Sequence, residues 1–420
     1  MSQRQRQFSP FWLLFILTGL NLLNYLDRSV LNAVRTPLAN DFGIGYGDSG
    51  RTVTAFMIGY FVTSPFFGYL GDRFSRKWLI AIGIFVWSLG TVLTGFATGF
   101  GMLLSYRVLV GLGEASYATI SPSLISDVFG ALKRNNAFTI FYVAIPVGSA
   151  LGYLLGGEVS AHWGWRKAFI WAGFPGLLLA LVLLPFAEPK RGQIDLGQNE
   201  NVTKPTLKDF LKLFVNVDYQ LIIWGYVAYT FALGAFAFWG PTFLEKVHNL
   251  STAHADRFFG AVLVGAGLIA TLLGGFAATL WQKHNPAGYA WLLCVSMLLA
   301  VPAALAAFLA KGTTATMCLL AAAMFLIFLA TGPVNTLIVE SVPLNLRASA
   351  MALSIFMIHL FGDMWSPEIV GRLADAWGHD LQKGVLILPA VLLLGGGFWV
   401  ALALRLRSRH VKSATSRPHS

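Results

Sequence analysis

The chain has 420 residues, of which 56% are hydrophobic and only 12% carry a charged Asp, Glu, Lys or Arg side chain. Soluble domains carry roughly 25% charged residues, so this composition excludes an ordinary soluble domain and favours a membrane protein. The net charge of +11 comes from basic residues in short segments between apolar runs. That pattern is typical of topology control rather than of nucleic-acid binding. The two cysteines, Cys294 and Cys318, lie inside apolar runs, so neither a disulfide framework nor a metal site is predicted, and no cofactor is expected.

Apolar runs of about 20 residues, the length that crosses a bilayer, occur twelve times along the chain. They cover 11–34, 50–70, 78–98, 101–125, 136–160, 167–187, 217–241, 257–280, 288–310, 315–340, 347–371 and 384–405. The longest polar break divides them six and six. We therefore predict an all-α membrane protein with two six-helix bundles, at 1–187 and 217–406, a cytoplasmic linker at 188–216 and a basic cytoplasmic tail at 407–420.

The distribution of basic residues predicts the orientation. If both termini are cytoplasmic, 19 of the 30 lysines and arginines fall on the inner side, 9 fall outside and 2 lie within spans. This bias supports cytoplasmic termini. The apolar run that begins at Phe11 is too long for a signal peptide and lacks a cleavage site, so it is interpreted as the first span.

The loop between the second and third runs reads GYLGDRFSRK from Gly68 to Lys77. It resembles the G-x-L-x-D-R-x-G-R-K signature of major facilitator transporters, with Ser75 at the second glycine. Asp72 is placed to meet a helix N-terminus, and Arg73 and Arg76 to pair with acids on adjacent helices. We interpret the loop as a gating element. A purely topological role would explain its basic residues but not Asp72 with Gly68.

A similar pattern recurs in each half of the chain, which indicates an internal duplication. An acid at a span end is followed seven residues later by arginine, first as Asp127 and Arg134 and then as Glu340 and Arg347. We assign these four residues to the gating loops.

Charged residues also occur within spans, where each costs a few kcal/mol. Arg107 and Glu114 are seven residues apart on one helical face, in an R-x-x-x-G-x-G pattern that resembles a signature of proton-coupled facilitators. The first span carries Asn24 and Arg28 on a polar stripe that Asp27 flanks. The hypothesis is one cluster in which protonation of an acid frees an arginine for an anionic substrate. A static ion-pair network is the alternative.

His359 and Asp363 are four residues apart in the eleventh run. This spacing indicates a pair that contacts a proton or a substrate headgroup in a cavity. A structural hydrogen-bonded pair is the alternative.

Four stretches together resemble the Spinster branch of the major facilitator superfamily. They read NYLDRSVLNAV at 24–34, RVLVGLGEASYATISP at 107–122, PVGSALGYLLGG at 146–157 and HLFGDMWSPEIVGRLAD at 359–375. The resemblance implies a twelve-helix fold with alternating access and a lipid-like cargo such as a lysophospholipid or sphingosine phosphate. It makes Arg28, Arg107 and Glu114 candidates for headgroup binding or coupling, and Asp27 a candidate proton carrier. The short termini without a signal suggest a bacterial inner-membrane protein.

The sequence thus predicts a proton-coupled secondary transporter of an amphipathic anionic lipid, with Asp27, Glu114 and Arg107 in coupling. The expected substrate-binding residues are Asn24, Arg28, Arg107, Glu114, His359 and Asp363. A carrier of small organic anions or drugs stays open, as does a receptor or channel. No HExxH, GxSxG or Cys/His constellation supports an intramembrane enzyme. The expected partners are the substrate, protons and the bilayer, with the protein as a monomer.

Overall fold

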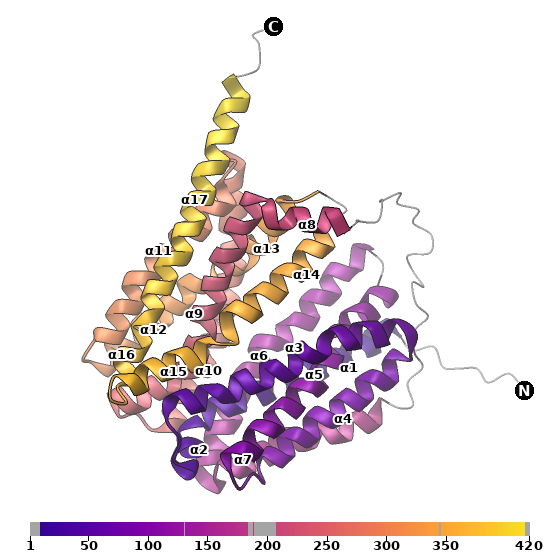
Figure 1. The fold of residues 1–420 in the computed structure, drawn as a ribbon, viewed down its shortest axis with the longest axis vertical. Coiled ribbons are helices and arrows are strands. Elements are labelled where there is room, and N and C mark those ends of the chain that lie inside the picture. Colours follow the sequence, from indigo (N-terminus) through magenta and orange to yellow (C-terminus); the bar gives the residue numbers. More distant parts are fainter. Residues whose placement is uncertain (1–8, 130, 184–187, 189–206, 344–345, 416–420) are drawn as a thin grey trace, which may run out of the picture. The chain divides into compact units, whose positions relative to one another are not determined.

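The computed structural model describes residues 9–129, 131–183, 188, 207–343 and 346–415, and every regular element in these ranges is a helix (Figure 1). Contacts divide the chain into two compact units. Unit 1 comprises Met1–Glu200 and Leu250–Leu263, and unit 2 comprises Asn201–Asn249 and Val264–Ser420.

Unit 1 is built from seven helices and the first turns of an eighth. These are α1 (Pro10–Ala33), α2 (Arg35–Phe42), α3 (Tyr46–Arg73), α4 (Arg76–Thr94), α5 (Phe100–Val128), α6 (Ala131–Trp163), α7 (Trp165–Val182) and the start of α10 (Thr252–His284). In this unit α1 packs on α6, while α5 packs on both α3 and α4. Several of these helices contain an internal proline, which a membrane helix tolerates because its neighbours satisfy the freed backbone groups.

The first turns of α10 are held to α6 within unit 1. Arg257 Nε donates a hydrogen bond to Glu158 Oε1 at 2.6 Å, and Asp256, which is fully buried, lies directly over the backbone of Gly157. The remainder of α10, from Val264, belongs to unit 2, so this helix is shared by both units.

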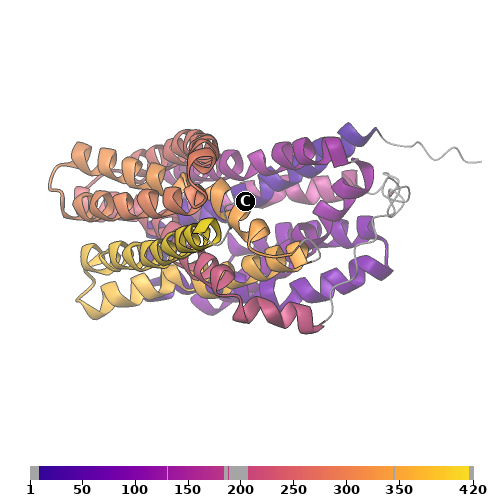
Figure 2. The ribbon, with the colours of Figure 1, turned by 90° about the horizontal axis from the view of Figure 1, so that it is seen from above.

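Unit 2 contains the other helices. They are α8 (Leu207–Val215), α9 (Val217–His248), α11 (Gly288–Leu309), α12 (Thr313–Phe328), α13 (Thr331–Glu340), α14 (Arg347–Ile358), the π-helix η3 (His359–Asp363), α15 (Ser366–Ala376), α16 (Leu381–Val385) and α17 (Ile387–Thr415). The long α17 packs along α11 and α9, as Figures 1 and 2 show.

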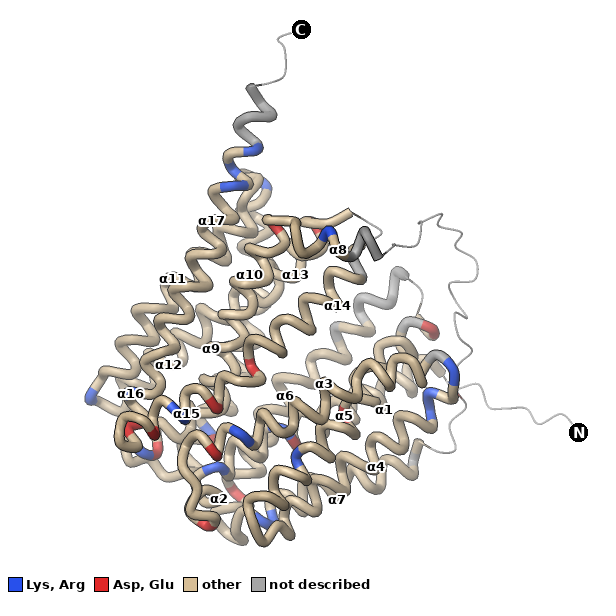
Figure 3. The backbone as a smooth tube through the Cα atoms, viewed as in Figure 1, with Lys and Arg blue, Asp and Glu red and all other residues tan. Residues whose placement is uncertain are grey.

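Within the described residues, nine helical stretches are long and apolar enough to cross a membrane. Charged positions are sparse along the helices and gather mainly near helix ends and turns (Figure 3). Large apolar side chains such as Phe66, Leu272 and Phe276 are mostly exposed, as a surface in contact with lipid requires. The nine stretches match nine of the predicted spans. For the other three, at α1, α7 and α14–α15, crossing stays a prediction, as does the cytoplasmic position of the termini.

Three predicted spans are not single continuous α-helices. One of them, 384–405, begins in α16 and continues in α17 after a break at Leu386. The run at 315–340 forms α12 and α13, which are separated at Leu329 and Ala330, and the run at 347–371 forms α14, η3 and the start of α15. A hydropathy pattern reports the length of an apolar run, whereas such breaks depend on packing against neighbouring helices.

Candidate functional site

Four charged side chains meet inside unit 1. Asp27 and Arg28 lie near the end of α1, and Arg107 and Glu114 lie on α5. Asp27, Arg107 and Glu114 are at most 2% exposed, while the Arg28 side chain is 22% exposed. We call these four residues the charged cluster.

The charged cluster is organised around one short ion pair. Arg28 Nε donates to Glu114 Oε2 at 2.6 Å. Asp27 accepts a hydrogen bond from the Thr91 hydroxyl of α4, and Arg107 interacts electrostatically with both acids. Arg28 and Glu114 therefore pair across two helices, α1 and α5.

Aromatic rings surround the Arg28 guanidinium. Its central carbon lies 5.0 Å from the ring centre of Tyr25, 4.8 Å from that of Phe56 and 5.5 Å from that of Tyr60. The Arg107 guanidinium lies 5.2 Å from the same Phe56 ring. Cation–π contacts offset part of the cost of removing the guanidinium groups from water. This aromatic shell escapes prediction from the sequence because Phe56 and Tyr60 lie far from both arginines along the chain.

Two glycines explain how α5 brings Arg107 and Glu114 to this place. A side chain at Gly111 would collide with the backbone oxygen of Phe56 on α3, and a side chain at Gly113 would collide with the backbone of Trp87 on α4. The glycines of the R-x-x-x-G-x-G pattern thus let α5 lie close to both helices, as small residues do in membrane bundles. That close approach brings Arg107 of α5 beside the Phe56 ring of α3.

Several polar atoms of the charged cluster have no hydrogen-bond partner within the described part of the chain. They are Nε and Nη1 of Arg107 and Oδ1 of Asp27. Buried polar groups are nearly always hydrogen-bonded, so each exception requires an explanation. Donors of a guanidinium and acceptors of two carboxylates in one buried place are suited to an anionic group and a proton.

Two asparagines of the polar stripe of α1 bond to α6. Asn21 Nδ2 donates to the Phe141 backbone oxygen at 2.9 Å, and Asn32 Nδ2 donates to the Tyr153 hydroxyl at 3.2 Å. These two asparagines fasten α1 to α6. Asn24 is buried between them, one turn before Arg28.

The predicted gating loop contains a second buried network, centred on Arg76. Its Nη1 lies 2.5 Å from Asp127 Oδ2 at the end of α5, and its Nε lies 3.2 Å from Glu188 Oε1 after α7. Glu188 also accepts hydrogen bonds from the Ser75 hydroxyl at 2.6 Å and from the Arg76 backbone at 3.1 Å. Arg76 thus joins the starts or ends of three helices.

The Glu188 carboxyl has a lowered pKa. Partial burial raises it, but the hydrogen bonds from Ser75 and Arg76 and the charge of Arg76 outweigh burial. In the sequence-based prediction Glu188 is only the start of the linker and has no role. An acid directly after an apolar span, on the same side as an arginine-rich loop, was the available signal.

Other predicted gating residues are placed as follows. Gly68 faces Thr119 of α5, whose methyl would lie 3.8 Å from a Cβ atom added at the glycine. Arg73 is exposed and stacks on Tyr69 of its own helix, 4.0 Å from the ring centre. Glu340 is exposed at the end of α13. The side chains of Asp72, Arg134 and Arg347 lie outside the described residues.

His359 and Asp363 pair within unit 2. His359 Nδ1 lies 2.9 and 3.0 Å from the two carboxylate oxygens of Asp363, and the pair spans the π-helical turn η3. Both side chains are partly exposed, at 29% and 24%.

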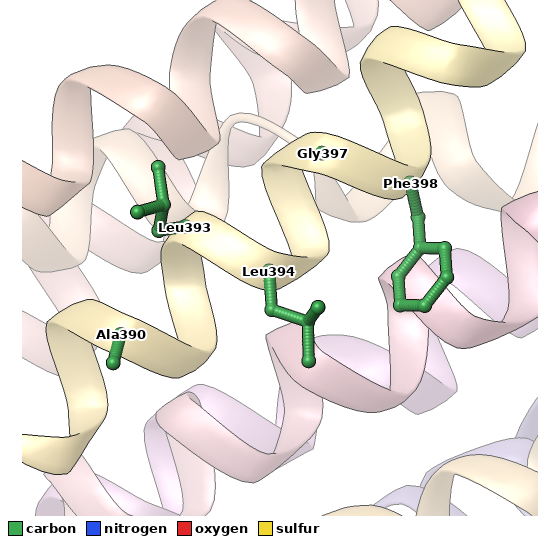
Figure 4. A pocket seen from close by; sticks show the side chains of 5 residues that line it. All are labelled: Ala390, Leu393, Leu394, Gly397 and Phe398. Atoms are coloured by element: carbon green, nitrogen blue, oxygen red, sulfur yellow. The ribbon is translucent and has the colours of Figure 1, made fainter.

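Metal ligands and surface hollows were also considered in the described part of the chain. Within the described ranges, no group of three or more His, Cys, Asp or Glu side chains could hold a metal ion. A hollow on the surface of α17 is lined by apolar residues only, and Figure 4 shows them along one side of the helix: Ala390, Leu393, Leu394, Gly397 and Phe398. It offers no polar side chain to a ligand.

Comparison with known proteins agrees with this architecture. Residues 17–367 match the model of the Major Facilitator Superfamily. The chain is 34% identical to "Protein spinster" of Drosophila melanogaster over 89% of this chain and 64% of that protein, and so spans just under two thirds of that relative. It is 32% identical to a sphingosine-1-phosphate transporter of Danio rerio, over 93% of this chain and 83% of that protein.

The fold is also that of a solved relative. The crystal structure of a bacterial homologue of the human lysosomal transporter Spinster, inward-facing and unoccupied, superposes with a TM-score of 0.86 at 24% identity, over 97% of this chain and 99% of that one. The chain therefore belongs to the Major Facilitator Superfamily and, within it, to the Spinster family of multi-pass membrane transporters.

Proposed function

We propose that this protein is a proton-coupled, alternating-access carrier of an amphipathic anionic lipid, of the lysophospholipid or sphingosine-phosphate kind. The observation that carries the proposal is the charged cluster, in which buried guanidinium donors of Arg107 lack a partner among the described residues while two acids lie beside them. The relative from Danio rerio is named a sphingosine-1-phosphate transporter, which supports a lipid as the substrate class.

Coupling follows from charge balance. The cluster has two acids and two arginines, so its formal charge is zero when both acids are ionised. Protonation of one acid leaves a net positive charge, which favours entry of an anion into a buried place. Release of the proton restores the internal pairs and favours release of the anion. In this scheme Asp27 carries the proton, Arg28 and Arg107 meet the anionic group with Asn24, and Glu114 holds Arg28 between cycles.

The gating loops set the balance between two states of the carrier. Arg76 with Asp127, together with Gly68, Asp72 and Arg73, would form contacts in one state that break in the other. Arg134, Glu340 and Arg347 have the corresponding role at the other predicted loops. His359 and Asp363 contribute to substrate binding from unit 2. We further propose a monomer in the inner membrane of a bacterium, with cytoplasmic termini and bundles at 1–187 and 217–406.

The test is transport in proteoliposomes, with labelled lysophospholipid and sphingosine phosphate offered with and without an imposed pH gradient. A pool of small organic anions serves as the comparison. Saturable lipid movement that follows the gradient is the expected result. Movement of small anions alone would refute the lipid cargo and favour a carrier of small organic anions.

Asp27→Asn separates proton coupling from substrate movement. We expect the variant to lose gradient-driven transport but to keep exchange of labelled for unlabelled substrate, because exchange needs no net proton transfer. Asp48→Asn removes a half-buried acid of α3 that pairs with Arg51 and serves as the control. Equal loss of both activities in Asp27→Asn would contradict its role as proton carrier.

A further inference from the structure

The hollow on α17 faces away from the helices of unit 2 on which α17 packs. Its volume is about 610 Å³, and the residues that line it lie within Ala390–Phe398 (Figure 4). Leu394 in this lining is 61% exposed, whereas Leu392 and Trp399 are fully buried on the side of α17 that contacts α9 and α11. The hollow is therefore an apolar feature of the surface of unit 2.

Two arginines follow on the same side of α17, beyond the hollow. The helix is continuous from Ile387 to Thr415, and an α-helix turns by about 100° and rises about 1.5 Å per residue. Arg405 comes seven residues after Phe398 and so returns to within about 20° of the same direction, about 10 Å further along the axis. Arg409 lies one turn later, in the basic end of α17 that Figure 3 shows.

The two arginines share a single acid. Asp218, in the first turn of α9, accepts a hydrogen bond from Arg405 Nε at 2.7 Å through one oxygen and a hydrogen bond from Arg409 Nη1 through the other. In the described part of unit 2, no other acid pairs with either arginine, and their side chains are 40% and 56% exposed. Because each guanidinium has five N–H donors, the three groups together keep one net positive charge and donors for a further anion.

The short helix α8 indicates the depth at which these arginines lie. It ends three residues before Asp218 and runs across α9 (Figure 1). Leu213 is buried, and Asn216 Nδ2 fixes the turn after α8 by donating to a backbone oxygen at 3.0 Å. Three apolar side chains of α8 are 54%, 48% and 77% exposed: Leu211, Phe214 and Val215. A helix with such a surface is typical of the boundary between lipid headgroups and hydrocarbon.

An apolar hollow with guanidinium groups beyond one end matches the two parts of a phospholipid. Guanidinium groups bind phosphate oxygens through parallel hydrogen bonds. Measured along the axis from Arg405, the hollow extends from about 10 Å at Phe398 to about 22 Å at Ala390. Half of a bilayer, headgroups included, is about 20–22 Å thick, so the acyl chain of a lipid with its phosphate at Arg405 passes the hollow. The net positive charge favours a headgroup without an amine.

We propose that an anionic phospholipid of the bilayer binds along α17, with its phosphate on Arg405 and Arg409 and an acyl chain in the hollow at Ala390–Phe398. The site lies within unit 2 and is separate from the charged cluster of unit 1. It therefore concerns a lipid that stays in the membrane and does not depend on which substrate the carrier moves.

The probe is phosphatidylglycerol with a diazirine in one acyl chain, added to the purified full-length protein in detergent. After illumination, the lipid attached to α17 is quantified by mass spectrometry at increasing lipid concentration. We expect half-saturation at about ten-fold lower concentration than for phosphatidylcholine with the same chains, as two partly exposed charge pairs together provide. Arg405→Gln combined with Arg409→Gln should remove this difference between the two lipids.

Gly397→Phe tests the hollow itself. No atom lies within 4 Å of a side chain started at Gly397, so the ring fits the protein and occupies the hollow. Attachment of both lipids to α17 should fall several-fold. Gly101→Phe is the matched control, because Gly101 of α5 is also exposed and has equally open surroundings; it should leave attachment to α17 unchanged.

Arg407→Gln is the control for charge. Arg407 is exposed and lies about 200° around the helix from Arg405, so its loss removes an equal charge from another side of α17 and should keep the preference for phosphatidylglycerol. Equal half-saturation of both lipids on the wild type would overturn the anionic site, as would loss of the preference in Arg407→Gln. Unchanged attachment in Gly397→Phe would overturn the place of the acyl chain. The proteoliposome assay tests the proposed transport separately from all of these outcomes.

Discussion

The hydroxyl of Thr91 should set the pH range in which the transporter works. Thr91 donates a hydrogen bond to Asp27, and both side chains are at most 1% exposed. A hydrogen bond donated to a carboxylate stabilises its ionised form. Thr91→Val keeps the shape of the side chain and removes the donor, so the variant should hold the proton up to a higher pH than the wild type.

The size of the effect follows from the strength of the bond. A hydrogen bond to a charged group contributes about 1.5–3 kcal/mol, and one pH unit corresponds to about 1.4 kcal/mol. The midpoint of gradient-driven transport should therefore move about 1 to 2 units toward alkaline pH. The assay is initial uptake into proteoliposomes as a function of external pH, with the gradient held constant.

A neighbouring residue provides the control. Thr94 is also fully buried on α4, but its hydroxyl donates to the Gly90 backbone oxygen of its own helix at 2.8 Å. Thr94→Val should leave the midpoint in place. An acid shift in Thr91→Val would mean that Asp27 donates its proton to the hydroxyl, and no shift would mean that Asp27 does not titrate during transport. Either result would refute the reasoning.

Two further predictions concern the connections of unit 1. Glu188→Gln should lower stability at pH 7 by on the order of 1 kcal/mol or less, because the carboxyl is partly exposed. The pKa of Glu188 lies below its usual value of 4.5, so its contribution is complete above that value and is lost as pH falls through the lowered pKa. Melting temperatures of variant and wild type should differ at pH 7 and converge as the pH falls below the lowered pKa; a constant difference would contradict this. Reversing the pair as Glu158→Arg with Arg257→Glu should recover stability that each single change loses, with a coupling of about 0.2–1 kcal/mol in a double-mutant cycle, and zero coupling would show that the pair does not hold α10 to α6.

The sequence predicts the helical class well because apolar runs and intramembrane charges are local features. Arg107 and Glu114 were recognisable from spacing on one helix, and Asp27 and Arg28 from their place within an apolar run. The choice of Arg28 as the partner of Glu114 depends on the crossing of α1 and α5, which no periodicity reports. Side chains that contact the site from other helices, such as Thr91, cannot be singled out from the sequence of the apolar span in which they lie.

The π-helix at His359 was beyond sequence reasoning for a related reason. A spacing of four predicts a pair on one face of an α-helix, and the pair does form. The extra residue in the turn depends on α9, where Thr230 and Gly234 fit against Gly362 and Asp363. Such irregularities follow from the fit of two surfaces, so they can be seen only once both helices are in place.

The division of α10 between the two units has a mechanical consequence. A helix whose first turns pack with one body and whose remainder packs with another cannot follow either as a rigid rod when the bodies rotate. It must bend at the boundary between the two units, just after Leu263, or release its first turns. Gly265 lies at that point with no atom near its missing side chain, whereas the first turns bury Ala255, Asp256 and Phe259 completely. In the proposed alternating-access cycle, the place for α10 to bend would therefore be near Gly265 rather than within its buried first turns.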